Sequence, residues 1–207
     1  MATKIDYYIV NDDSNGTIIS GSAWEAQTFT ASQAYDIGAV KLKLFRDTGT
    51  TPGTITVSIR TTSAGKPTST VLATGTTNGN SLPEFGAEGE WRTIVFDAVS
   101  ALTSGIMYAI VVSAAANYAA WRTDASSPAY AGGTRVSSAN AGAAWTIDAT
   151  QDHMFETYDE TVAGVSSPSS DKTFSKKLVT AANNEIWYES SAGTMTELSD
   201  DSNDVDT

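Results

Sequence analysis

The chain has 207 residues, enough for one large or two small domains, and carries 24 acidic against 12 basic residues, a net charge of −12. Because nucleic acid is bound chiefly by neutralising phosphates with Lys and Arg, this balance argues against a nucleic-acid partner. Cysteine is absent, so no disulfide supports the fold, and the longest apolar run (residues 106–112) is far shorter than the ~20 residues that a membrane helix needs.

The periodic segments of the chain alternate apolar and polar residues, which is the pattern of half-buried β-strands. In residues 40–44 (VKLKL) three apolar side chains fall on one face and two lysines on the other, and residues 54–60 (TITVSIR) repeat the pattern after a Gly/Pro/Thr turn. The predicted strands, in chain order, are 4–10, 17–20, 27–30, 40–44, 54–60, 70–76, 90–98, 105–114, 117–123 and 152–159.

Turn signals and adjacency predict how some of these strands pair. Asn15-Gly16 offers the positive φ angles of a tight hairpin between the first two strands. Residues 105–114 are apolar on both faces, which predicts a central strand covered on both sides, with 117–123 as its hairpin partner. Since no useful segment has a helical period, the sequence predicts an all-β fold: an antiparallel β-sandwich with jelly-roll-like connections over residues 1–160.

A second region is expected after the sandwich. Residues 161–171 are rich in Gly, Ser and Pro and predict a linker, and residues 172–207 predict a small three-stranded β-meander with an acidic tail. Three strands approach the minimum for independent stability, so the apolar Ile186, Trp187 and Tyr188 need cover and are predicted to form an assembly interface. The chain ends without a closing element, so we also expect this region to begin a longer one.

Residues 24–158 run through the succession QTFTAS, VKLKLFR, PGTITVSIRTTSAGKPTSTVLATGT, GEWRTIVFD, LTSGIMYAIVVSA and NYAAWRTDASSPAYAGG. This succession resembles the choice-of-anchor or carbohydrate-binding-like β-sandwich modules of bacterial surface proteins and tailed-phage structural proteins. The later segment KKLVTAANNEIWYESSAGTMTEL resembles one unit of the repeated strand meanders of phage structural proteins. The resemblance implies a sandwich fold and a virion or cell-surface setting, and it implies no catalytic residues. The chain passes from Met1 into a predicted strand without a secretory h-region, which favours the phage setting.

The residues that often carry catalysis or metal binding have simpler explanations here. His153 is the only histidine, no G-x-S-x-G nucleophile motif accompanies it, and without cysteine a zinc site of the usual kind is excluded, so a structural role is favoured. The carboxylates of one Gly-rich loop and the following strand are expected to be solvated charges, because close spacing in a loop does not predict a catalytic pair across a sugar. They are Glu84, Glu88, Glu90 and Asp97.

The pattern N-x-D-x-N-G resembles the first half of a calcium-binding loop, with Asn11, Asp13, Asn15 and Gly16 in the required spacing. Ser22 stands where that loop needs a bidentate Glu, so a plain hairpin turn is the favoured interpretation. A structural calcium elsewhere in the sandwich stays open. We therefore predict a non-enzymatic protein with no catalytic residue, cofactor or assigned metal ligand.

Aromatic side chains in a loop-rich stretch are the best candidates for a ligand site. Flat rings stack on sugars, and neighbouring polar groups such as Asp124 and Asn140 could bond hydroxyls. The alternative for each tryptophan is ordinary core packing. The candidate glycan-binding residues are Tyr118, Trp121, Arg122, Tyr130 and Trp145.

Two functions follow as expectations. The first is a structural protein on the outer surface of a bacteriophage virion: a capsid decoration, head fibre or tail-associated subunit. Its partners would be other virion proteins and further copies of itself. The second is a carbohydrate-binding module that attaches a larger protein to a cell surface, with a surface glycan as its ligand. Neither involves membrane insertion or nucleic acid.

Overall fold

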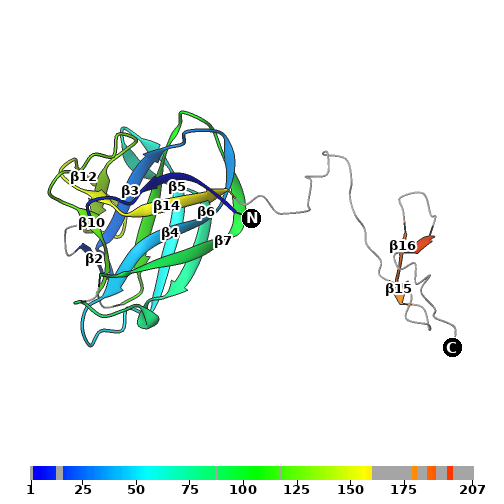
Figure 1. Cartoon of the computed structure of the whole chain (residues 1–207), viewed down its shortest axis with the longest axis horizontal. Helices are drawn as coiled ribbons and strands as arrows, with labels where there is room; N and C mark the ends of the chain where they lie inside the picture. The colour runs from blue at the N-terminus through cyan, green and yellow to red at the C-terminus, as the bar shows by residue number, and fades with distance from the viewer. Residues whose placement is uncertain are drawn as a thin grey trace. The chain divides into compact units, whose positions relative to one another are not determined.

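A computed structural model describes residues 2–12, 16–86, 88–116 and 118–159, together with the backbone of residues 179–180, 186–189 and 195–197. The chain divides into two compact units, Met1–Ala163 and Gly164–Thr207 (Figure 1). Apart from one 3-10 turn, η1 (Gly79–Ser81), the regular elements of the described residues are all β-strands. The fold is therefore all-β, as the sequence predicted. The predicted linker at 161–171 lies outside the described residues.

Two six-stranded antiparallel sheets pack together in the first unit, as a β-sandwich requires. In the first sheet the order is β1-β14-β4-β9-β2, and β7 pairs with β4 outside this path. Figure 1 shows β4 between β14 and β7. Its strands are β1 (Thr3–Tyr8), β14 (Phe155–Asp159), β4 (Tyr35–Arg46), β9 (Ala119–Trp121), β2 (Thr17–Ile19) and β7 (Glu90–Leu102).

The second sheet has the order β12-β11-β3-β8-β5-β6, and a further short ladder joins β10 to β13. Its strands are β12 (Thr146–Asp148), β11 (Arg135–Ser138), β3 (Trp24–Thr30), β8 (Met107–Ala114), β5 (Thr54–Ser63) and β6 (Lys66–Asn78). The short ladder consists of β10 (Thr123–Asp124) and β13 (Asp152–His153).

The main core lies between the two sheets and explains the alternation in the sequence. Val40, Leu42 and Leu44 of β4 are fully buried, and so are Ile55 and Ile59 of β5. The two strands belong to opposite sheets, and these side chains join one apolar cluster. Burial of each such side chain stabilises the fold by roughly 1.5–3 kcal/mol. A shift of either strand by one residue would turn several of these side chains to solvent, and their burial free energy would be lost.

A second, smaller core covers the outer face of the second sheet. Val111 of β8 packs there with Ala26 of β3, Val136 of β11 and Trp145 from the segment between β11 and β12. The same strand β8 sends Ile110 and Val112 into the main core. The prediction of a central strand covered on both faces is therefore confirmed for β8.

Both predicted hairpins are wrong. Strand β1 pairs with β14, and β2 pairs with β9, although Asn15-Gly16 separates β1 from β2. Strand β9 pairs with β4 and β2, whereas β8 pairs with β3 and β5. The turn signals are local, but both pairings are decided by which strands can bury their inward faces in the same core.

The second unit contains a three-stranded antiparallel sheet, β15 (Val179–Thr180), β16 (Ile186–Glu189) and β17 (Met195–Glu197). These strands match the meander that the sequence predicts. The proposed interface residues Ile186, Trp187 and Tyr188 lie in β16. Their side chains fall outside what the structure describes, so this interface stays a prediction.

The edges of the two sheets meet where β6 lies against β7. A Cβ atom added at Gly75 of β6 would lie 2.4 Å from the backbone oxygen of Val95 in β7. We predict that Gly75→Ala lowers the free energy of unfolding by about 1–3 kcal/mol, because one of the two backbones must move. Chemical denaturation measures the change, with the exposed neighbour Thr76→Ala as the control. Equal stability of the two variants would contradict this close approach.

Candidate functional site

Trp121, the centre of the predicted glycan platform, is a core residue. Its side chain has 0% exposure and stacks on His153, with 4.0 Å between ring centroids and 7° between planes. The indole Nε1–H donates to the carbonyl oxygen of Met154 at 2.8 Å. Because a ring covered in this way cannot meet a sugar, the platform prediction is wrong for Trp121, and the core-packing alternative holds.

The other predicted platform residues are not brought together on one surface. Arg122 donates to Asp12 through Nε at 2.5 Å, and Tyr130 meets Phe155 edge-on at 5.2 Å between centroids, beside the main core. Trp145 is buried in the second core, and Tyr118 is 46% exposed. Tyr118 is therefore the one freely accessible ring of the set. The nearby polar residues serve the fold too: Asp124 accepts the Tyr8 hydroxyl, and the side-chain oxygen of Asn140 accepts the backbone N–H of Ala144.

A buried ion-pair network ties the second sheet to the strand that carries His153. The Arg135 guanidinium donates to both carboxylate oxygens of Glu25, at 2.9 Å each, and to Asp148 at 2.7 Å. The Nε2 atom of His153 lies 3.4 Å from the same Glu25 carboxylate and 3.4 Å from the hydroxyl of Thr17. Its Nδ1 atom has no hydrogen-bond partner within the described part of the chain.

These contacts set the charge states of the network. Burial would raise the pKa of Glu25, but the hydrogen bonds from His153 and Arg135 outweigh it and lower that pKa. Burial lowers the pKa of His153, with Glu25 opposing the shift, so the imidazole is neutral at pH 7. The network is a structural crosslink, because a fully buried imidazole beside a carboxylate and a guanidinium meets no surface that a substrate could reach.

A second polar layer lies next to it. The side chain of Gln27 accepts the backbone N–H of His153 at 2.8 Å and donates to Asp152 at 3.0 Å. Burial raises the pKa of Asp152, and the neighbouring Asp124 adds to the effect. Sequence reasoning missed Glu25 and Gln27, because polar residues in a strand ordinarily mark its solvent face.

The loop carboxylates also have structural surroundings. Glu84 pairs with Arg46 at 2.8 Å, and Glu90 pairs with Arg92. Within the described ranges, no cluster of three or more His, Asp or Glu side chains is arranged to hold a metal ion. The same ranges contain no helix long and apolar enough to span a membrane.

The most distinctive exposed surface is the outer face of the first sheet. The solvent face of an antiparallel sheet is normally polar. Here the exposed side chains include Tyr7 of β1 and, on β7, Trp91, Val95 and Val99. An apolar surface on an otherwise acidic protein marks a candidate contact site.

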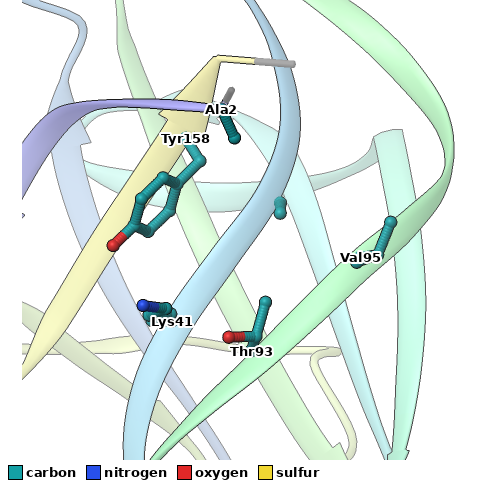
Figure 2. Close-up of a pocket in the computed structure, with 6 residues that line it drawn as sticks. Ala2, Lys41, Thr93, Val95 and Tyr158 are labelled. Atoms are coloured by element: carbon teal, nitrogen blue, oxygen red, sulfur yellow. The ribbon is translucent and has the colours of Figure 1, made fainter. Parts of the chain in front are cut away.

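A hollow lies in this face, and a small residue creates it. Tyr158, Ala39 and Val95 are cross-strand neighbours on β14, β4 and β7, so the alanine lies between two larger side chains. Figure 2 shows Tyr158 on one side of the hollow and Val95 on the other, with Lys41 and Thr93 along its border. The hollow encloses about 270 Å³ and is lined by Ala2, Ala39, Lys41, Thr93, Val95 and Tyr158.

The tyrosine at this hollow is held in place. Its hydroxyl donates to Glu156, which also accepts from Lys4 at 3.1 Å. Partial burial and the Glu156 carboxylate raise the pKa of Tyr158 to about 12, so the phenol stays protonated. The ammonium of Lys41 lies 5.2 Å from the ring centroid, a cation–π distance. Sequence reasoning missed this site, because cross-strand neighbours from three distant segments leave no local motif.

Comparison with known proteins identifies no relative of this chain. The sequence matches no protein-family model, and it is similar to no curated protein.

We predict that Trp121→Ala lowers the free energy of unfolding by about 3–5 kcal/mol, because it leaves a cavity in the core and removes the hydrogen bond to Met154. Thermal and chemical denaturation measure the loss. Tyr118→Ala, at an exposed aromatic position, is the matched control and should change stability by no more than about 0.5 kcal/mol. If the Trp121→Ala protein were as stable as the control, the burial of Trp121 in the core would be contradicted.

Stability should fall as the pH drops below 6.5, the ordinary pKa of His153. In that range the unfolded chain binds a proton that the folded chain, with its lowered His153 pKa, does not. Glu25 adds a loss in the same direction below 4.5, because its pKa is also lowered on folding. Denaturation between pH 7.5 and pH 5.5, values that bracket about 6.5, measures the slope. His153→Gln should flatten it, and an unchanged slope would assign the effect to other groups.

Proposed function

We propose that this protein is a non-enzymatic structural protein of a bacteriophage virion, located on the outer surface as a capsid decoration, head fibre or tail-associated subunit. It would act through protein–protein interfaces with other virion proteins and with further copies of itself. The observation that carries the proposal is a strip of exposed side chains on β7 in which three large apolar residues, Trp91, Val95 and Val99, are 38%, 56% and 45% exposed. The exposed Thr93 and Asp97 lie between them along the strand.

The rest of the first unit suits a rigid spacer. The buried carboxylate of Glu25 is paired with the partly buried guanidinium of Arg135, and the large aromatic side chains of the candidate platform are mostly packed in the interior. A stable interface buries on the order of 1,600 Å² in total, and a strip with several large apolar side chains along one long strand can form the centre of such a contact. The net charge of −12 suits the outside of a particle packed with DNA better than the inside.

The resemblance of residues 24–158 to sandwich modules of tailed-phage structural proteins supports the virion setting. The second candidate is a carbohydrate-binding module that attaches a larger protein to a cell surface. The hollow beside Tyr158 favours this alternative, because it combines an aromatic wall with polar groups at its border. The two functions are compatible in one virion protein.

Light scattering coupled to size-exclusion chromatography of the whole chain tests the proposal. We expect a defined oligomer of the 21.7 kDa chain that falls to monomer in the double variant Trp91→Glu/Val99→Glu, because the buried charges cannot be paired in the interface. The double variant Val71→Glu/Thr76→Glu introduces the same two charges at exposed positions of β6 in the second sheet and is the matched control. A wild-type chain that stays monomeric at every concentration would contradict self-assembly through this strip.

A further inference from the structure

We propose that the hollow on the outer face of the first sheet binds a single pyranose ring of a surface glycan. This inference rests on the second candidate function given above and specifies the ligand class of its site. The site uses Tyr158 of β14 and Ala39 and Lys41 of β4, together with Thr93 and Val95 of β7, and Val95 also belongs to the strip on β7. The inference begins from the floor, where Ala39 leaves room between Tyr158 and Val95 for the apolar C–H face of a sugar.

The aromatic wall is already in its binding position. The Tyr158 ring is held at its hydroxyl by Glu156, which is itself held by Lys4, and the Lys41 ammonium lies over the ring. A side chain fixed on two sides loses little conformational freedom when a ligand arrives. An exposed tyrosine without such support would have to be ordered at the moment of binding.

The border of the hollow supplies the polar groups that sugar hydroxyls need. Lys41 forms no ion pair with a carboxylate in the described part of the chain, like Arg60 and Lys66. The other described cations each pair with at least one carboxylate: Lys4, Lys43, Arg46, Arg92, Arg122 and Arg135. The Lys41 ammonium therefore keeps donors for a ligand. Thr93 adds an exposed hydroxyl, and Glu156 adds a carboxylate beside the ring. A mostly apolar lining with a few polar groups is the usual composition of a small-molecule site.

The backbone around the hollow argues for a sugar rather than a peptide. Strand β14 is paired with β1 on one side and β4 on the other, and β4 is paired with β14 and β7. The floor therefore has no free strand edge at which a peptide could add a strand. The volume of about 270 Å³ is near the lower end of the range for small-molecule sites, roughly 300–1,000 Å³, which suits one ring in an open site.

Saturation-transfer NMR on the whole chain tests the site, with the methyl glycopyranosides of glucose, galactose, mannose and N-acetylglucosamine as probes at about 10 mM. We expect transfer to at least one probe, with a dissociation constant of roughly millimolar order. Ala39→Leu should weaken that binding by at least about tenfold, because the larger side chain fills the floor. Thr76→Leu places the same side chain on the outer face of the second sheet and should leave binding unchanged.

Lys41→Met is a second variant that keeps the bulk of the side chain and removes its charge, so it should weaken binding even if Ala39→Leu disturbs the fold. Transfer to none of the four probes overturns the proposal, as does binding that survives both variants. If Ala39→Leu lowers the mass of the oligomer while no probe binds, the hollow is a protein contact and the glycan proposal is wrong. Loss of sugar binding with an unchanged mass separates this site from the assembly strip.

Discussion

Strand β14 is hydrogen-bonded to β1 on one side and to β4 on the other, and the remaining features of the first unit depend on this insertion. It joins residues near the start of the chain to residues about 150 positions later, as the pairing of Lys4 with Tyr158 shows. Its inward residue Phe155 enters the main core, and the preceding His153 lies under Trp121. Its outward residue Tyr158 forms one wall of the hollow, and Glu156 accepts a hydrogen bond from the Tyr158 hydroxyl. Strand β14 therefore serves the core and the exposed face, and the short strand β13 just before it carries His153 of the buried polar network.

The buried polar network has a cost that its partners offset. A guanidinium and a carboxylate removed from water would each be strongly destabilising alone, but Arg135 donates to both oxygens of Glu25 and to Asp148. Replacing all the charged members of such a network with apolar residues can be neutral, so its presence argues for a defined geometry more than for stability. Here it connects β3, β11 and β12 to the strand that holds His153 against Trp121. These hydrogen bonds and ion pairs are directional, so they fix how β3, β11 and β12 are placed relative to the strand that carries His153.

The outer face of the first sheet carries several large apolar side chains that are exposed to solvent. Trp145 covers part of the second sheet, and Trp121 fills the core, yet Trp91 and Val95 stay exposed on β7. The tryptophans that the sequence offered as ligand candidates, Trp121 and Trp145, are packed in the interior. The candidate contact surface is instead made of residues from three separate strands, β14, β4 and β7. Assembly along β7 and sugar binding in the hollow would use neighbouring parts of that surface, with Val95 common to both.

The amino-acid sequence alone determined the fold class, because a period of two places Val40, Leu42 and Leu44 on one face whatever the neighbouring strands are. It also identified β8 as a strand covered on both sides, and it predicted the three strands of the second unit. It did not determine the pairing of β1 with β14 or of β9 with β4, nor did it reveal the strands β11 and β12. Such pairings join distant segments and are selected by burial in a shared core, which leaves no local signal. For the same reason only the tertiary structure decided that Trp121 is buried and that Ala39 lies between Tyr158 and Val95.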